Sequence, residues 1–303
     1  MFISIIIPTY NRNNVLCDTI NSVYEVTEID KVTNFEIIIV DQSKEHDKNT
    51  IEFLDMISKK KKNFSLYNLT IANLPNARNY GISKAIGDII LFLDDDIILQ
   101  PNYFRSLLDS YVNEDVKSVV GRILLKNETN DNVLLNNQSY IKKILKKILM
   151  SIIDSRKNFI ITSYGLILSN TSSSKKAYVD SGMGCNMSFK KEVFNELGLF
   201  DTSYIGNAIR EETDIFIRLC KHDYKILYNP DMFLYHVMSN TGGCRYEYDI
   251  NYWKKYFFNQ CYFYKKNFNY GIIKVGILLG FDIIKCMSKN INAIKILKEV
   301  YPK

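Results

Sequence analysis

Short apolar runs alternate with amphipathic stretches along the first third of the chain. Residues 2–7, 35–40 and 89–93 are predominantly apolar and each run ends in polar residues. Such runs are typical of strands that are buried on both faces of a parallel sheet. Between the first two, apolar residues recur at helical spacing from Val15 to Val23. The pattern therefore predicts an α/β domain in which helices cross between parallel strands.

The rest of the chain continues this order with less regular elements. Helices are expected over residues 46–60, 76–86, 190–197 and from 210 onward, and strands over 64–69, 116–125 and 179–189. Pro8 is expected to end the first strand, because proline lacks the amide donor of a ladder. Asn229-Pro230 is likewise expected to divide residues 224–237 into two strands. Glycines interrupt 179–189, a feature of places where a ligand or another backbone approaches closely.

Three carboxylates, Asp94, Asp95 and Asp96, directly follow the strand predicted over 89–93. In an extended chain Asp94 and Asp96 share one face, and Asp95 points the other way. Ligands of open α/β sheets bind outside the carboxyl ends of the strands. Two convergent carboxylates are ligands suited to Mg²⁺ or Mn²⁺, so the pattern indicates a divalent cation site.

The bulk composition fits a reduced globular protein. The chain has 303 residues and is 47% apolar, which is enough for a substantial core. Its six cysteines are scattered without a CxxC pair, so we expect reduced thiols and a cytoplasmic protein. The first residues run directly into a strand pattern, and no signal peptide is expected.

Positive charge is concentrated in two segments, although the net charge is only +6. Residues 139–157 combine six Lys or Arg and one Asp with an aliphatic stripe at helical spacing, which predicts a basic amphipathic helix. Residues 250–303 mix ten Lys with Tyr, Phe and Trp. Both compositions suit either a membrane surface or a helix packed on a core. The run over 271–287 is too short and too charged to span a bilayer, and the confined charge argues against nucleic acid as a partner.

Seven short motifs together resemble the family 2 glycosyltransferases. They are IIIPTYNR at 5–12, IVDQS at 39–43, ARNYGI at 77–82, GDIILFLDDD at 87–96, GCNMSF at 184–189, GLFD at 198–201 and EETD at 211–214. The resemblance covers about residues 2–240 and implies a GT-A fold: a Rossmann-like α/β domain with a mixed central sheet and a C-terminal helical extension. It divides the chain into a catalytic domain over 1–245 and an aromatic and basic helical segment over 246–303. Within the domain, 1–125 would form the nucleotide-binding half, 126–178 an insertion with the basic helix, and 179–245 the acceptor half.

The resemblance also implies a role for each matching residue. The nucleotide-sugar would be held by Thr9, Arg12, Asp41, Arg78, Asp94 and Asp95, with Asp41 reading the base edge. Asp96 would be the direct metal ligand, with Asp94 between metal and ribose, and His236 matches a position that in some members helps to bind metal. Glu212 occupies the place of the acceptor base, where the family usually has the Asp of a Glu-Asp pair. Because this chain has Glu-Glu, Glu211 and Asp214 remain alternative bases.

The expected activity is inverting transfer of a sugar from a UDP-, GDP- or dTDP-linked donor to a hydroxyl of a glycan or lipid-linked acceptor, in cell-surface polysaccharide synthesis. The expected cofactor is Mn²⁺ or Mg²⁺, and the expected place is the cytoplasmic, inner face of the membrane, as a peripheral protein. Two other classes stay open. A sugar nucleotidyltransferase should carry a Gly-rich phosphate loop after the first strand, where this chain has Pro8-Thr9-Tyr10. A non-catalytic membrane scaffold on the same fold would have no need of the acids at positions 41, 94, 96 and 212.

Overall fold

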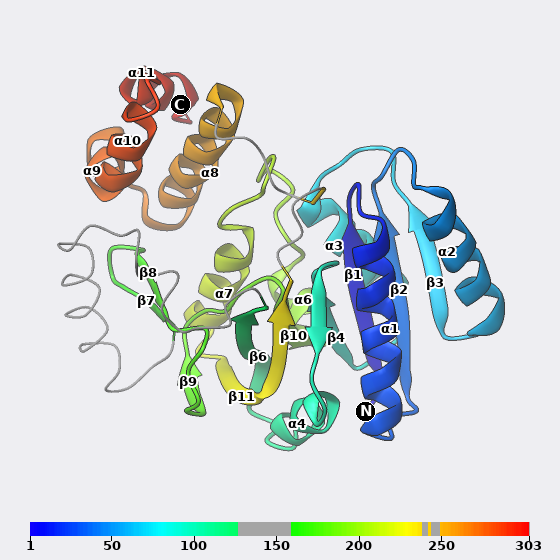
Figure 1. Cartoon of the computed structure of the whole chain (residues 1–303). Coiled ribbons are helices and arrows are strands. Elements are labelled where there is room, and N and C mark those ends of the chain that lie inside the picture. Colours follow the sequence, from blue (N-terminus) through cyan, green and yellow to red (C-terminus); the bar gives the residue numbers. More distant parts are fainter. Residues whose placement is uncertain (127–158, 238–241, 244–248, 303) are drawn as a thin grey trace.

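The structure is a computed structural model of the chain, and it describes residues 1–126, 159–237, 242–243 and 249–302 (Figure 1). The basic helix expected over 139–157 lies outside the described residues.

A mixed sheet forms the centre of the molecule. Its strands lie in the order β3 (Phe64–Asn68), β2 (Phe35–Asp41), β1 (Ile3–Thr9), β4 (Ile89–Leu93), β10 (Asn186–Lys190), β6 (Val116–Leu125), β11 (Lys225–His236) and β5 (Ile97–Leu99). The first four are parallel, as the apolar runs predicted. β10 runs antiparallel between β4 and β6, and β11 pairs parallel with β6. The short strand β9 (Ala177–Val179) pairs with β11, and β7 (Phe159–Ile161) pairs with β8 (Ile167–Ser169).

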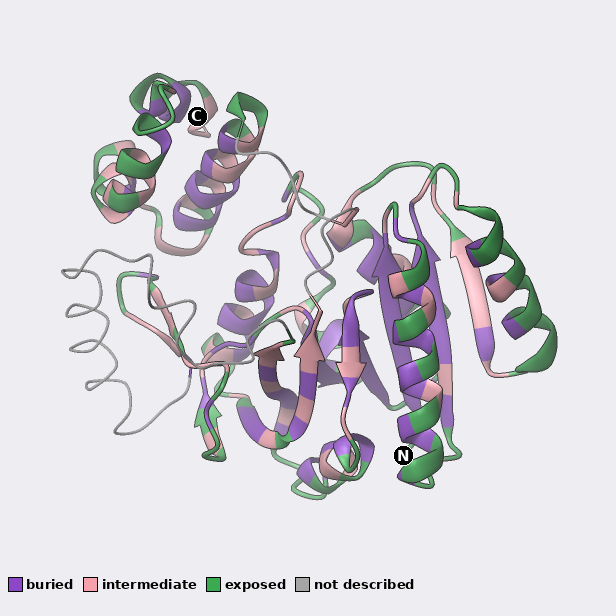
Figure 2. Ribbon diagram, in the orientation of Figure 1, coloured by how far each residue is buried: buried purple, intermediate pink, exposed green. Residues whose placement is uncertain are grey.

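Helices cover both faces of this sheet. One face packs on α1 (Asn14–Ile29), α2 (Lys48–Lys60) and α4 (Tyr103–Ser110), and the other on α3 (Leu74–Lys84), α6 (Glu192–Leu197) and α7 (Glu211–Lys221). Successive residues of β1 supply both layers, since Ile5 and Ile7 join the first cluster and Ile6 joins the second. Burial on both faces explains why β1, β2 and β4 show no alternation of apolar and polar residues (Figure 2).

The C-terminal helices form a further layer beside α7 (Figure 1). They are α8 (Ile250–Phe268), α9 (Ile272–Leu278), α10 (Gly280–Met287) and α11 (Ala293–Val300). Their core contains Trp253, Phe257 and Tyr264, together with Tyr204 and Ile217 of the sheet domain. Much of the aromatic content of this segment therefore packs inward. None of the described helices combines the length and the apolar character needed to cross a bilayer.

Three local expectations are wrong. Pro8 lies inside β1, where it pairs with Val40 of β2; β4 accompanies β1 only as far as Ile6, so one side of the backbone at Pro8 needs no ladder partner. Residues 225–236 form one strand across Pro230, because a register shift between Asn229 and Phe233 accommodates the proline. Residues 180–185 form a loop between β9 and β10 instead of a strand.

Candidate active site

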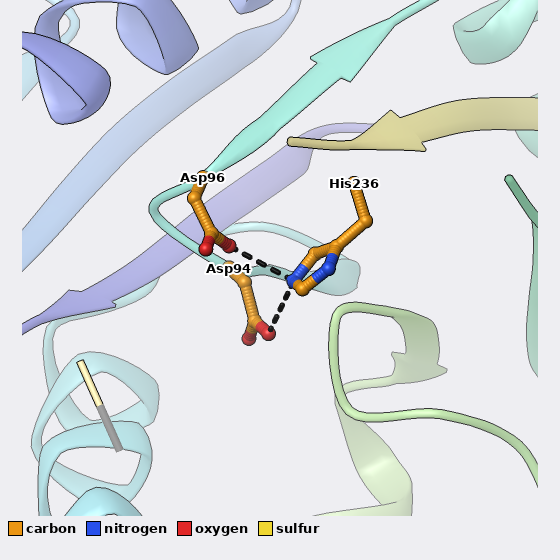
Figure 3. A group of neighbouring side chains, drawn as sticks. All are labelled: Asp94, Asp96 and His236. Carbon is orange, nitrogen blue, oxygen red and sulfur yellow. Dashed lines mark ion pairs between the residues drawn. The ribbon is translucent and has the colours of Figure 1, made fainter. Parts of the chain in front are cut away.

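Two carboxylates and one imidazole converge at the end of β4. Nε2 of His236 lies 2.9 Å from Oδ1 of Asp96 and 3.7 Å from Oδ2 of Asp94 (Figure 3). The sheet causes this contact, because β11 pairs with β5 so that His236 lies opposite Ile97, next to Asp96. The Val237 N–H also donates to the Asp96 carbonyl at 2.8 Å. The sequence prediction that Asp94 and Asp96 face the same way agrees with this arrangement.

Asp95 is buried beside this group and contacts residues at the end of β1 and in the loop after it. It accepts hydrogen bonds from Thr9 Oγ1 at 2.7 Å and from Arg12 Nε at 3.1 Å. Arg12 also donates through Nη2 to Asp96 Oδ2 at 2.9 Å, so a single buried guanidinium holds two neighbouring carboxylates. Burial raises the pKa of Asp95 to about 7 although Arg12 and Thr9 act in the opposite direction. Thr9 at the end of β1 and Arg12 in the loop after it therefore hold Asp95 and Asp96 in position.

The donor set of Asp94, Asp96 and His236 fits a divalent cation. One ligand atom from each residue lies within 4.8 Å of the other two. Burial alone would lower the pKa of His236, but hydrogen bonds to Asp94 and Asp96 and their charges raise it to about 10. The two carboxylates therefore attract positive charge to this point. Two oxygens and one imidazole nitrogen are ligands that Mn²⁺ accepts.

Arg78 lies beneath the same acids and is fully buried. Its guanidinium forms an ion pair with Glu211 at the start of α7 and lies 3.9 Å from Asp94 Oδ1. It also donates to the Gly184 carbonyl at 3.2 Å and lies against the rings of Phe92 and Phe200. Arg78 thereby connects α3, α7 and the carboxylates after β4.

The three candidate bases on α7 have different surroundings. Glu211 is buried and paired with Arg78. Asp214 is completely buried away from the cavity, where it accepts hydrogen bonds from Lys266 and Asn267 at 3.0 Å. Glu212 is half-buried and lines the cavity, and burial raises its pKa against the opposing charges of Arg78 and Arg210.

These groups line one cavity of about 680 Å³. Of the residues that the sequence singles out, it is lined by Thr9, Arg12, Arg78, Asp94, Asp95, Asp96, Glu211, Glu212 and His236. Gly243 lies at its edge, and its N–H donates to the Tyr10 carbonyl at 2.7 Å. The size matches a small-molecule site, and the cavity joins the strand ends to the start of α7.

Asp41 is not among the lining residues. It is buried at the end of β2, where it accepts hydrogen bonds from the Ser43 N–H at 2.8 Å and lies 2.7 Å from Nε2 of His46. His46 was missed in the sequence, because it stands in an irregular segment before α2 with no motif around it. Gln42, the neighbour of Asp41, does line the cavity.

Solved structures show which fold this is. A mannosyltransferase from Pyrobaculum calidifontis in complex with GDP-Man and Mn²⁺ matches with a TM-score of 0.57 and 14% identity, over 89% of this chain and 64% of that one. GalNAc-T7 with UDP, GalNAc and Mn²⁺ matches with a TM-score of 0.60 and 18% identity, over 87% of this chain and 50% of that one. The fold is the GT-A fold that the sequence predicted.

Curated relatives match parts of the chain. An uncharacterized glycosyltransferase of Rickettsia conorii is 42% identical over 94 residues, which are 31% of this chain and 14% of the relative. The poly(ribitol-phosphate) beta-N-acetylglucosaminyltransferase TarP of Staphylococcus aureus is 26% identical over 171 residues, 51% of each chain. The GalNAc(5)-diNAcBac-PP-undecaprenol beta-1,3-glucosyltransferase of Campylobacter jejuni is 30% identical over 130 residues, 42% of this chain and 40% of the relative. The matches thus span about half or less of these relatives.

The family model for glycosyl transferase family 2 matches residues 4–198, which include the end of β1, Arg78 and the three acids after β4. This match covers more than half of the chain and agrees with the fold and with the curated relatives. The chain belongs to glycosyl transferase family 2.

Proposed function

We propose that the protein is an inverting, metal-dependent glycosyltransferase that moves a sugar from a nucleotide-sugar to a hydroxyl group of a glycan or lipid-linked acceptor. The observation that carries this proposal is the convergence of Asp94, Asp96 and His236 in the same cavity as Glu212. That cavity thus offers both ligands for the cation that accompanies a diphosphate and a carboxylate base.

Asp94, Asp96 and His236 would hold Mn²⁺ or Mg²⁺. A cation there supplies positive charge to the diphosphate that leaves with the nucleotide. Arg12 keeps Asp96 in place through its 2.9 Å hydrogen bond, and Thr9 fixes Asp95 below it. The Arg78 guanidinium lies 3.9 Å from Asp94 Oδ1 and so attracts that carboxylate. Thr9, Arg12, Arg78 and Asp95 all reach the cavity, which supports their proposed part in donor binding.

Glu212 is the proposed general base. A half-buried carboxylate with a raised pKa is a stronger proton acceptor than an exposed one. It would take the proton of the acceptor hydroxyl while the oxygen attacks the anomeric carbon from the side opposite the diphosphate, which inverts that centre. Glu211 is engaged by Arg78 and Asp214 by α8, so neither is placed as well for this step.

The acceptor is proposed from chemistry and from the relatives. The Staphylococcus relative is named for poly(ribitol-phosphate) and the Campylobacter relative for an undecaprenol-linked glycan. Both names describe polymers or lipid-linked glycans, which supports a glycan or lipid-linked acceptor here and a part in cell-surface polysaccharide synthesis. The basic C-terminal segment supports a peripheral position at the cytoplasmic face of a membrane.

The test is release of nucleoside diphosphate from UDP-, GDP- and dTDP-sugars, with Mn²⁺, with Mg²⁺ and with chelator. We expect release from one donor class, lost with chelator and restored by the cation, and a much slower reaction in Glu212→Gln. A sugar nucleotidyltransferase would instead form nucleotide-sugar from nucleoside triphosphate and sugar phosphate. A scaffold would bind without turnover of any donor.

A further inference from the structure

The outward side of α9 and α10 consists of large apolar side chains. Ile273, Ile277, Phe281, Ile284 and Met287 are 79%, 75%, 65%, 65% and 50% exposed, and together we call them the outer ridge. Their spacing of four, four, three and three residues places them on one side of a helix. The Leu279 N–H donates to Val275 and the Ile283 N–H to Leu279, so helical hydrogen bonding continues across the junction of α9 and α10. The two helices are separated by Leu279, whose φ is −92° and ψ is 12°, but the exposed residues keep a helical spacing across it.

The inward side of the same helices is apolar as well. Val275, Leu279 and Cys286 are buried in the C-terminal core with α8 and α11. A helix that packs with one side on a core normally turns polar residues to water on the other side. Here the inward side packs on the core, and the outer ridge is a second apolar side that faces away from it. Five large apolar side chains in one stripe exceed the scattered exposed residues of an ordinary surface.

The basic and acidic residues of α9 and α10 lie on different sides of the two helices. Lys274 and Lys285 are exposed and follow Ile273 and Ile284 by one position, so they flank the outer ridge, and the exposed Lys289 comes just after its end. Asp282, the acid of α9 and α10, is half-buried; burial and then the Asp282 carboxylate raise the pKa of Tyr256 on α8. The Lys274 ammonium lies 3.5 Å from the ring centroid of Tyr270, just before α9. The outward side thus presents large apolar groups with exposed lysines along their border. That combination complements an anionic lipid surface, where apolar side chains enter the acyl boundary and lysines meet the headgroups.

We propose that the outer ridge and its flanking lysines dock the protein on an anionic membrane surface. This inference specifies the membrane partner named in the proposed function, and the functional significance of docking rests on that proposal. The side chains involved are on the C-terminal helices, away from the cavity residues, so docking and donor turnover can be measured separately.

The test is flotation of the 303-residue chain with vesicles of mixed phosphatidylglycerol and phosphatidylcholine, compared with vesicles of phosphatidylcholine alone. We expect binding to the anionic vesicles that weakens with added salt. The double variant Ile277→Gln with Phe281→Gln should bind at least about tenfold more weakly, because it removes two apolar side chains from the lipid contact. Lys274→Gln with Lys285→Gln should reduce the preference for anionic vesicles. Ile86→Gln is the matched control, since Ile86 is 71% exposed on the sheet domain, and it should bind normally.

The proposal is overturned if the intact chain does not float with anionic vesicles, or if the ridge double variant floats as well as the parent. It is also overturned if the parent forms a dimer in analytical ultracentrifugation that the ridge variant lacks, because the outer ridge would then bind a second copy. Donor hydrolysis should be equal in the parent, the ridge variant and the control. Lost docking with intact hydrolysis affects this inference alone, whereas absent hydrolysis in the parent counts against the proposed function.

Discussion

The ammonium group of Lys266 lies 3.0 Å from Oδ2 of Asp214 and 2.7 Å from Oδ2 of Asp201. One lysine of α8 thus joins the first turns of α7 to the loop before it. Two residues of α8 extend this contact, because Gln260 accepts from Arg210 Nε at 2.8 Å and Asn259 pairs with the backbone of Ile205. The segment that α8 holds contains Glu211 and Glu212. We infer that the C-terminal helices fix the position of the proposed base.

Lys266→Met should destabilise the protein by about 1–3 kcal/mol, because Asp214 then loses a charged partner while it stays buried. Urea unfolding followed by circular dichroism measures this. Lys254→Met is the control: Lys254 is on the same helix, but its ion pair with Glu299 is exposed and 3.6 Å long, so its loss should cost less than about 1 kcal/mol. Equal losses of stability in the two variants would show that the buried contact contributes no more than the exposed ion pair.

The stability difference between Lys266→Met and the parent should depend on pH. Burial alone would raise the pKa of Asp201, but Lys266, the Ser203 N–H and Tyr262 together hold it well below 3.8. A lowered pKa in the folded state gives stability above the unfolded pKa, which is lost as the pH falls further. The parent should therefore lose part of its advantage over Lys266→Met below about pH 4. A constant difference across that range would contradict the assignment.

Glu212→Gln should lower kcat by about 10²- to 10⁴-fold and leave the KM for the nucleotide-sugar nearly unchanged. Because burial raises the pKa of Glu212 above its ordinary value of 4.5, the rate of the parent should rise with pH through that higher pKa, as the base loses its proton. The variant should lack this limb. Glu211→Gln and Asp214→Asn test the two alternative bases. If one of them removes turnover and Glu212→Gln does not, that residue is the general base.

Asp41→Asn should weaken nucleoside diphosphate binding by about tenfold if Asp41 reads the base edge, since a hydrogen bond to a charged group contributes about 1.5–3 kcal/mol. His46→Gln should weaken binding less, because His46 contacts Asp41 from the side and Ser43 still holds the carboxylate. Isothermal titration with UDP, GDP and dTDP measures both. Unchanged affinity in Asp41→Asn would mean that another residue beside the cavity, such as Gln42, contacts the nucleotide base.

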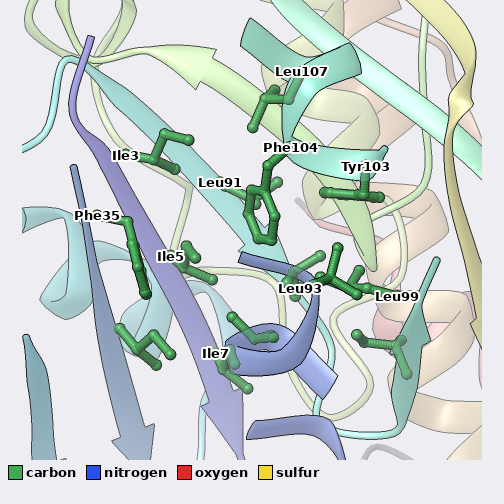
Figure 4. Packing of buried hydrophobic residues seen from close by; sticks show 14 of the residues in the cluster. Ile3, Ile5, Ile7, Phe35, Leu91, Leu93, Leu99, Tyr103, Phe104 and Leu107 are labelled. Atoms are coloured by element: carbon green, nitrogen blue, oxygen red, sulfur yellow. The ribbon is translucent and has the colours of Figure 1, made fainter. Parts of the chain in front are cut away.

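The sequence predicts the parallel half of the sheet well, because β1, β2 and β4 are buried on both sides; β3, at the edge, is only partly buried. Figure 4 shows the reason: Ile3, Ile5 and Ile7 of β1 fill one layer together with Leu91 and Leu93 of β4. The pairing of β10 between β4 and β6 was out of reach, since hydrophobic pattern does not specify strand direction or neighbours. The continuous strand across Pro230 was missed because a proline usually ends a strand, and β5 and β9 were missed because three residues are too few to show a hydrophobic pattern.

The sequence predicts which residue types form the candidate site, but it does not predict the contacts among them. The acids after β4 and the carboxylates that open α7 stand in recognisable motifs. The contacts that distinguish them, such as Arg78 with Glu211 or His236 with Asp96, join residues more than a hundred positions apart and need the fold. The division of the chain at residue 245 and the roles of the individual site residues stay predictions.

Binding of Mn²⁺ tests the central claim most directly. Free Mn²⁺ is followed by electron paramagnetic resonance as it is titrated into the parent, Asp96→Ala and Asp55→Ala, each with and without nucleoside diphosphate. Asp55 is exposed on α2, paired only with its helical neighbour Lys59 among the described residues, and serves as the control. We predict one bound Mn²⁺ in the parent and in Asp55→Ala, tighter with nucleotide, and none in Asp96→Ala. Binding that is unchanged in Asp96→Ala, or absent from the parent, would contradict the account.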